Sequence, residues 1–357
     1  MPAMAAIPAP LSSSTIRRLD GIEAARGVAA ASVVLYHVAR HVDKAAAAPW
    51  LTTAFQSGHA GVDLFFVLSG FIILHTHRAD IGQPSRLFRY VGRRFTRVLP
   101  LYWIALGVSV AIGVVGRHGW PAAADFAWSA SLLPTWREPI LGVAWTLQYE
   151  AVFYAFFAVL ICSRAAGMAL LASWLALIVT GMFGAGVSAL PPALTGGYAL
   201  EFFLGMCASL VLHHGPTPLP GWLTWAGILG FATAGTLESR GVLDGYGDLA
   251  RVAYGVPAML TVLGLAAADQ AGRLRVPGWL AAMGSASYSI YLFQFVFIGI
   301  VWQILQRFGM GTSLPTLSVF AILAAAALGG GMLMRRAVER PLLARVRDHS
   351  PSALKQA

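Results

Sequence analysis

Apolar runs alternate along this chain with short polar segments, and each run is long enough to cross a lipid bilayer. A spanning helix needs about 20 mostly apolar residues. Ten segments of the chain approach or exceed that length: residues 19–39, 60–77, 98–116, 143–162, 165–188, 193–212, 221–237, 248–268, 279–301 and 315–334. The pattern therefore predicts an all-α polytopic membrane protein with about ten transmembrane helices. Residues 125–133 are too few to span and predict an interfacial or re-entrant helix.

The composition supports this class and excludes a soluble globular protein. Of the 357 residues, 57% are hydrophobic and 11% are charged, whereas soluble domains carry about 25% charged residues. The net charge of +10 would suggest nucleic acid in a soluble protein. Here the preference of Lys and Arg for cytoplasmic loops explains it, so the bilayer is the expected partner and no nucleic acid is expected.

The positions of the basic residues predict the orientation. With the N-terminus inside, most of the 25 Lys and Arg residues fall in cytoplasmic segments, and an even number of spans requires both termini on one side. Both termini are therefore predicted to be cytoplasmic. We expect a disordered cytoplasmic tail over residues 1–18, a transmembrane domain over 19–340 and a basic cytoplasmic tail over 341–357, with no appended soluble domain.

Arg26 and His37 are eleven residues apart within the first apolar segment. Eleven residues make close to three helical turns, so both side chains lie on one helix face, about 16 Å apart along the axis. Arginine suits an anion, and histidine, with an ordinary pKa of about 6.5, suits acid–base catalysis. The alternative is that Arg26 reaches the lipid headgroups and His37 hydrogen-bonds a neighbouring helix.

A cluster of arginines, Arg93, Arg94 and Arg97, precedes the third apolar segment. Arg94 and Arg97 are neighbours on a helix, and guanidinium groups match the geometry of phosphate. The cluster therefore predicts a cytoplasmic site for a phosphate-rich donor such as a coenzyme A ester. The alternative is that it reflects only the positive charge of cytoplasmic segments.

Two carboxylates lie in apolar segments, where charge is costly. Glu150 either orients and polarises a histidine, acts as a base itself, or pairs with a membrane arginine. Asp63 begins the second apolar segment, where it caps the helix, pairs with Arg40 or contacts substrate. Two further charges, Glu201 and Arg251, are expected to neutralise each other.

Other polar residues gather on one face of the ninth apolar segment. Ser287, Tyr291 and Gln294 share that face, where they either line a polar cavity or bond a neighbouring helix. Cys162 and Cys207 form no metal-binding pattern, so no metal is expected.

Six stretches, in this order, resemble the acyltransferase-3 family, whose members are bacterial inner-membrane O-acyltransferases of surface glycans. The stretches are "LDGIEAARGVAAASVVLYH", "GVDLFFVLSGFII", "RRFTRVLPLYW", "AWTLQYEAVFYAFF", "ASYSIYLFQ" and "ERP". The residues of these stretches are most similar to those of the exopolysaccharide-modifying branch of the family. The resemblance covers nearly the whole chain.

The family's motifs fall on particular residues of this chain. Its Arg-x10-His pattern matches Arg26 and His37, and its Arg-x-x-Arg pattern matches Arg94 and Arg97. Its Trp-Ser-Leu-x-x-Glu-like stretch matches at Trp145, Leu147 and Glu150, with Thr146 where Ser is usual. Its Ser-Tyr-x-x-Tyr-Leu stretch matches at Ser287, Tyr288, Tyr291 and Leu292, with Gln294 where His is common.

The resemblance implies transfer of an acyl group, with acetyl expected, from cytoplasmic acyl-coenzyme A to a sugar hydroxyl. The acceptor is implied to be an exopolysaccharide, lipopolysaccharide or other lipid-linked or exported glycan. His37 and Glu150 are then the expected catalytic residues, and Arg26, Arg93, Arg94 and Arg97 the expected donor site. Asp63, Trp145, Tyr291 and Gln294 are candidates for substrate binding, and polysaccharide assembly proteins are candidate partners.

Two rival classes stay open on the sequence. A transporter for a glycan or small anion also uses buried Arg and His, although it favours a two-half repeat that we do not find here. A non-catalytic scaffold of a polysaccharide assembly complex would tolerate replacement of His37 and Glu150.

Overall fold

The structure is a computed structural model that describes residues 19–116, 119–184, 189–215, 217 and 219–348. The expected tail at residues 1–18 lies outside these residues, as do residues 349–357 of the tail expected at 341–357, whose first part is helical. All regular elements of the described residues are helices, which confirms the all-α prediction. Within the same residues, nine helical segments are long and apolar enough to cross a membrane.

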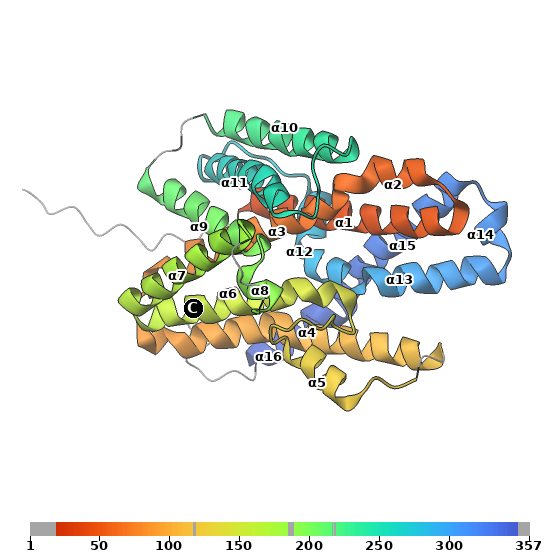
Figure 1. The fold of residues 1–357 in the computed structure, drawn as a ribbon, viewed down its shortest axis with the longest axis horizontal. Helices are drawn as coiled ribbons and strands as arrows, with labels where there is room; N and C mark the ends of the chain where they lie inside the picture. Colours follow the sequence, from red (N-terminus) through yellow and green to blue (C-terminus); the bar gives the residue numbers. More distant parts are fainter. Residues whose placement is uncertain (1–18, 117–118, 185–188, 216, 218, 349–357) are drawn as a thin grey trace, which may run out of the picture.

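Each predicted apolar segment coincides with helical structure over the residues that are described (Figure 1). Residues 185–188 of the predicted span 165–188 lie outside the described residues. The long helices are α1 (Asp20–Ala46), α3 (Gly61–His77), α4 (Leu87–Val115), α6 (Trp145–Cys162), α7 (Arg164–Met182), α9 (Tyr198–His214), α10 (Pro220–Ser239), α11 (Asp248–Gln270), α13 (Ser287–Arg307) and α15 (Thr316–Met334). The predicted span 221–237 corresponds to α10, which is long enough to cross but is not among the nine. A count of ten therefore stays a prediction.

Short helices connect the long ones: α2 (Pro49–Phe55), α5 (Ala123–Ser131), α8 (Pro192–Thr195), α12 (Gly278–Ser285), α14 (Met310–Ser313) and α16 (Arg340–Asp348). The predicted short helix at 125–133 corresponds to α5. The predicted span 279–301 is divided instead, because a single residue, Ala286, separates the end of α12 from the start of α13.

Two helix boundaries differ from the sequence prediction. α4 begins at Leu87, before the predicted span 98–116, so the arginine cluster lies on its first turns, and Pro100 is accommodated inside the helix. The last predicted span ends at residue 334, yet the chain stays helical through a π-helical turn, Arg335–Glu339, into α16. Proline removes an N–H that would bond the preceding turn, and the change from α-helical to π-helical spacing over Arg335–Glu339, directly before Pro341, accompanies this loss.

α1 lies at the centre of the bundle. It packs against α3, α11, α12, α13 and α15, and it is drawn in red at the middle of Figure 1. This position explains why α1 carries polar residues, since a central helix presents few residues to lipid. Its buried side includes small residues such as Ala29 and Ala30, which allow close helix contacts.

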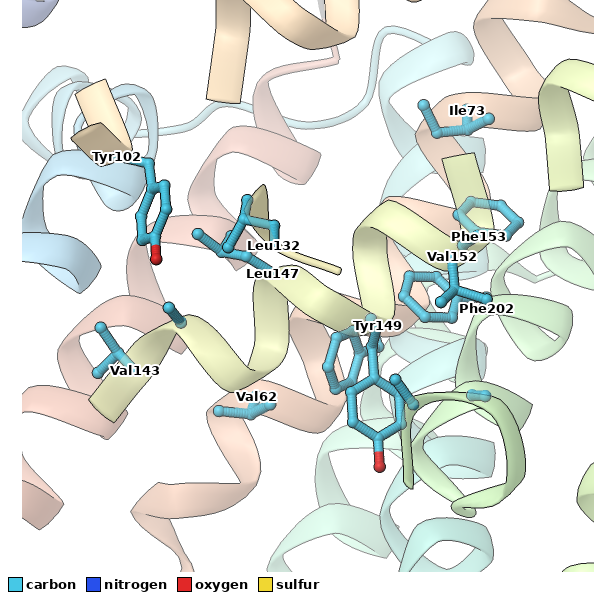
Figure 2. Close-up of a cluster of buried hydrophobic side chains, with 14 of the residues drawn as sticks. Val62, Ile73, Tyr102, Leu132, Val143, Leu147, Tyr149, Val152, Phe153 and Phe202 are labelled. Atoms are coloured by element: carbon cyan, nitrogen blue, oxygen red, sulfur yellow. The ribbon is translucent and has the colours of Figure 1, made fainter. Parts of the chain in front are cut away.

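The contact between α3 and α9 is close enough to require glycine. A Cβ atom on Gly70 would lie 2.1 Å from the carbonyl oxygen of Phe202, and one on Gly205 would lie 2.0 Å from that of Val67. The two glycines therefore allow the backbones of α3 and α9 to approach closely. Beside this contact, the rings of Phe153 and Phe202 stack with centroids 4.5 Å apart (Figure 2), and they belong to the main apolar core.

Candidate active site

One cavity, of about 330 Å³, lies among α1, α3, α4, α6 and α13. We call it the arginine cavity because Arg26, Arg94 and Arg97 line it. Two carboxylates, Glu23 and Glu150, also line it, so the wall has a net positive charge if histidine is neutral. Much of the remaining wall is apolar and aromatic. The predicted donor residue Arg93 is not among the lining residues.

Glu150 lies in the electrostatic field of two arginines on different helices. Its carboxylate interacts with Arg26 on α1 and Arg97 on α4, and with the side chains of Ser69 and Tyr154. Both arginines act on the Glu150 carboxylate through their electrostatic field. The alternative from the sequence that pairs Glu150 with a membrane arginine stays a prediction.

Several polar atoms of the arginine cavity have no hydrogen-bond partner in the described part of the chain. They include Nε of Arg94, which lies with its guanidinium 5.9 Å from the Tyr154 ring centroid, and Oγ of Ser287. The same holds for Nδ1 of His75 and Oε2 of Glu23. Because buried polar groups are normally hydrogen-bonded, this wall favours a polar or charged ligand over an apolar one.

A second cavity, of about 250 Å³, lies beside the C-terminal half of α1. We call it the tyrosine cavity. Its lining includes Tyr36, His37, Arg40, His59, Trp145, Tyr198, Tyr246, Tyr291 and Phe295. The aromatic rings offer flat apolar faces, and the hydroxyl, imidazole and guanidinium groups offer hydrogen bonds at their edges.

His37 is oriented by Gln294 on α13. Nδ1 of His37 lies 3.0 Å from Oε1 of Gln294, and Nε2 of Gln294 donates to the carbonyl oxygen of Tyr291 at 3.0 Å. The second bond assigns the amide oxygen of Gln294 to His37, so Nδ1 of His37 carries the proton. Nε2 of His37 is then the nitrogen with a free lone pair, as a general base requires.

The structure separates the two predicted catalytic residues. His37 lines the tyrosine cavity and Glu150 the arginine cavity, so Glu150 does not orient His37. Among the described residues, the His37 side chain hydrogen-bonds the side chain of Gln294 rather than a carboxylate. Gln294, where the family often has His, therefore has a positioning role that the sequence alone left open.

Asp63 has a different partner from those expected. It is fully buried and lines neither cavity. Its Oδ1 accepts a hydrogen bond from Nη1 of Arg251 at 2.6 Å. Glu201, also fully buried, lies beside this pair. The Arg251 guanidinium packs 4.1 Å from the ring centroid of Tyr198. Asp63 is therefore connected to the wall of the tyrosine cavity through Arg251 and Tyr198, and its predicted contact with substrate stays a prediction.

Several residues of the tyrosine cavity were not identified from the sequence. Tyr36 accepts from Nη1 of Arg40 at 2.8 Å and shares a short hydrogen bond with Tyr246. The His59 ring stacks on Tyr246 with centroids 4.6 Å apart, and its Nε2 lies 2.8 Å from Oε1 of Glu238. Burial and the hydrogen bond to Tyr36 raise the pKa of Tyr246, so its hydroxyl is neutral near pH 7.

The fold and the two cavities define a multi-helix membrane protein with a basic cavity and an aromatic, histidine-containing cavity that meet inside the bundle. The family described as "Acyltransferase domain" matches residues 19–336. The chain therefore belongs to the acyltransferase-3 family, which confirms the resemblance found in the sequence.

Two relatives come from Rhizobium species. The exopolysaccharide production protein ExoZ of Rhizobium meliloti (strain 1021) is 30% identical over 315 residues, which cover 84% of this chain and 94% of ExoZ. Protein 2 in the picA locus of Rhizobium radiobacter is 36% identical over 95 residues, or 26% of this chain and 43% of that protein. No solved structure matches the chain significantly.

Proposed function

We propose that this protein transfers an acyl group, acetyl in the expected case, from cytoplasmic acyl-coenzyme A to a sugar hydroxyl of an exported or lipid-linked surface polysaccharide. The bacterial inner membrane is the proposed location. One observation carries the proposal: a basic cavity and a cavity containing a correctly oriented histidine meet at shared residues inside the bundle. The similarity to ExoZ supports an exopolysaccharide as acceptor.

The residues of the arginine cavity fit an acyl-coenzyme A donor. Arg26, Arg94 and Arg97 supply charge and hydrogen bonds for phosphate, and the apolar wall suits the pantetheine arm. Bound there, the thioester would supply an activated carbonyl. The size of the cavity lies at the lower end of ligand pockets, roughly 300–1,000 Å³, so the arm rather than the whole coenzyme is the part enclosed.

His37 performs the proton transfers in this proposal. Its Nε2 removes the proton of the acceptor hydroxyl as the hydroxyl oxygen bonds to the thioester carbonyl carbon. The carbon–sulfur bond then breaks, and the thiolate takes the proton back from His37, so the residue ends unchanged. A covalent route through acyl-His37 is the alternative. Acyl-protein formed in stoichiometric amount without acceptor would identify that route.

The assay that tests the proposal uses the full-length protein in liposomes. Labelled acetyl-coenzyme A is supplied on one side, together with polysaccharide de-acylated by mild alkali. We expect protein-dependent label on the polysaccharide, released again by alkali. Movement of an unmodified glycan or anion without consumption of acyl-coenzyme A would contradict the proposal and favour a transporter. Absence of both activities would favour a scaffold.

Replacing Arg97 with alanine is expected to raise the apparent KM for acyl-coenzyme A. A hydrogen bond to a charged group contributes about 1.5–3 kcal/mol, and Arg97 is partly exposed, so we expect a rise of about 10-fold, the lower end of that range. Arg89→Ala is the matched control, since Arg89 lies on the same helix but does not line the cavity. Equal KM values for the two variants would assign Arg97 to membrane orientation only.

Replacing Tyr246 with phenylalanine is expected to weaken acceptor binding while donor binding stays the same. The variant keeps the ring that stacks on His59 and loses the hydrogen bond to Tyr36. A neutral hydrogen bond contributes about 0.5–1.5 kcal/mol, so the KM for the polysaccharide should rise about 2- to 10-fold. A rise in the donor KM instead would contradict the assignment of the tyrosine cavity to the acceptor.

A further inference from the structure

We propose that the Tyr291 side chain is the partition between the two cavities and that it limits the size of the acyl group that passes. The inference rests on the proposed function. It goes beyond it by naming a selectivity residue and by favouring acetyl over longer or charged acyl groups.

The position of Tyr291 is the first observation. Among the described residues, only Val62 and Tyr291 line both the arginine cavity and the tyrosine cavity. Val62 is small, so the tyrosine ring is the larger part of the shared wall. An acyl group bound beside the arginines must come into contact with this ring before a hydroxyl near His37 can reach its carbonyl carbon.

Hydrogen bonds hold the partition in place. The Tyr291 hydroxyl lies 3.1 Å from Oγ1 of Thr146 and 3.2 Å from the carbonyl oxygen of Val143. Oγ1 of Thr146 also donates to the Val143 carbonyl at 3.0 Å. Thr146 lines the arginine cavity and Val143 lines the tyrosine cavity. This triangle of hydrogen-bonded polar groups therefore spans the boundary between the two cavities, where the Tyr291 ring lies.

The ring has little freedom on its other side. Phe65 packs against it edge to face, with centroids 6.1 Å apart and planes at 65°, and Tyr291 is only 7% exposed. A larger acyl group must therefore displace the ring and break the hydrogen bonds to Thr146 and Val143. A charged acyl group such as succinyl would also lose hydration against Val62 and Phe65.

Tyr291 is also coupled to the base. Its carbonyl oxygen accepts the bond from Gln294 that orients the Gln294 amide toward His37. The residue that limits the passage is thus one helical turn from the residue that positions the imidazole. A closed partition also keeps water near His37 away from the thioester, which limits hydrolysis of the donor.

The expected donor preference follows from the loss in kcat/KM when an acyl group is too large for the passage beside Tyr291. One methylene group in a tight pocket changes kcat/KM by about 10- to 200-fold. The wild-type protein should therefore prefer acetyl- over butyryl-coenzyme A by at least about 10-fold, with succinyl-coenzyme A also a poor donor. Tyr291→Leu opens the passage and should reduce the butyryl discrimination to less than about 3-fold.

The experiment measures two rates for the wild-type protein and each variant in liposomes. One is acyl transfer to alkali-treated polysaccharide from acetyl-, butyryl- or succinyl-coenzyme A. The other is release of free coenzyme A thiol without acceptor, in which a water oxygen bonds to the carbonyl carbon and the carbon–sulfur bond breaks. Tyr291→Leu should raise this hydrolysis, and Tyr291→Phe, which keeps the ring but loses the hydroxyl, should raise it less.

Tyr102→Phe is the matched control. Its hydroxyl also makes a buried hydrogen bond, to the carbonyl oxygen of Ser129 at 2.6 Å, but Tyr102 lines neither cavity. It should keep wild-type donor preference and hydrolysis. If Tyr291→Leu does not fold, Tyr291→Phe and Thr146→Val carry the test, since both remove bonds of the triangle and keep the ring.

The outcomes separate this inference from the proposed function. Wild-type transfer with an unchanged donor preference and unchanged hydrolysis in the folded Tyr291 variants would overturn the partition alone. Failure of the wild-type protein to use any acyl donor, by transfer or by hydrolysis, would overturn the proposed function and the partition with it.

Discussion

Replacing His37 with alanine should lower the rate of acyl transfer by about 10²- to 10⁴-fold, the usual contribution of a positioned general base. The variant leaves both cavities and the fold in place but removes Nε2, the lone pair exposed by the bond between Nδ1 and Gln294. The measurement is the initial rate of transfer in liposomes at saturating donor and equal protein. Donor KM should change little, because His37 does not line the arginine cavity.

His41→Ala is the matched control for His37→Ala. His41 lies on α1 one turn further along, lines neither cavity and packs against Trp302 at 5.0 Å between ring centroids. It should keep most of the activity. Gln294→Leu should fall between the two, because it keeps the imidazole but no longer fixes which nitrogen carries the proton. A His37→Ala protein with near wild-type turnover would contradict the assigned role.

Replacing Arg251 with alanine should destabilise the protein by about 3–5 kcal/mol, the usual cost of removing one partner from a buried ion pair. The change leaves the buried carboxylate of Asp63 without its cation, beside Glu201. It also removes the guanidinium that packs on Tyr198. Unfolding of the detergent-solubilised protein by a denaturant titration measures the effect.

The control for Arg251→Ala is Arg137→Ala. Arg137 also pairs with a carboxylate at 2.6 Å, that of Asp125, but both side chains are about half exposed or more. Exposed pairs contribute little, so the free energy of unfolding should hardly change. A double variant that replaces Asp63 and Arg251 with leucine and methionine should recover part of the stability. An Arg251→Ala protein as stable as wild type would contradict the account of this pair.

Hydropathy predicted the helices well because spanning a bilayer imposes a local requirement on length and polarity. The placement of Arg26 and His37 on one helix could also be predicted from their spacing, since both residues belong to the same apolar segment. Helix ends were less predictable. The break between α12 and α13 and the π-helical turn before Pro341 depend on packing and backbone adjustment rather than on local apolar content.

The site was only partly predictable because its contacts join distant parts of the chain. His37 and Gln294 are 257 residues apart, and Asp63 and Arg251 are 188 apart. Spacing within one helix carries no information about such partners. For this reason the sequence left three roles open for Glu150, as orienter of a histidine, base or partner of an arginine, and three for Asp63, as helix cap, partner of Arg40 or substrate contact. Tyr246 was missed because it lies in a loop, where no periodic pattern identifies a cavity-lining residue.

The most direct test of the central claim is the content of alkali-labile acyl groups on the surface polysaccharide of the producing cells. Three strains are compared: one without the gene, one with the gene restored, and one restored with His37→Ala at equal protein level. We predict that one acyl group disappears without the gene and returns only when His37 is present. Identical acylation in all three strains would contradict an acyltransferase acting on that polysaccharide.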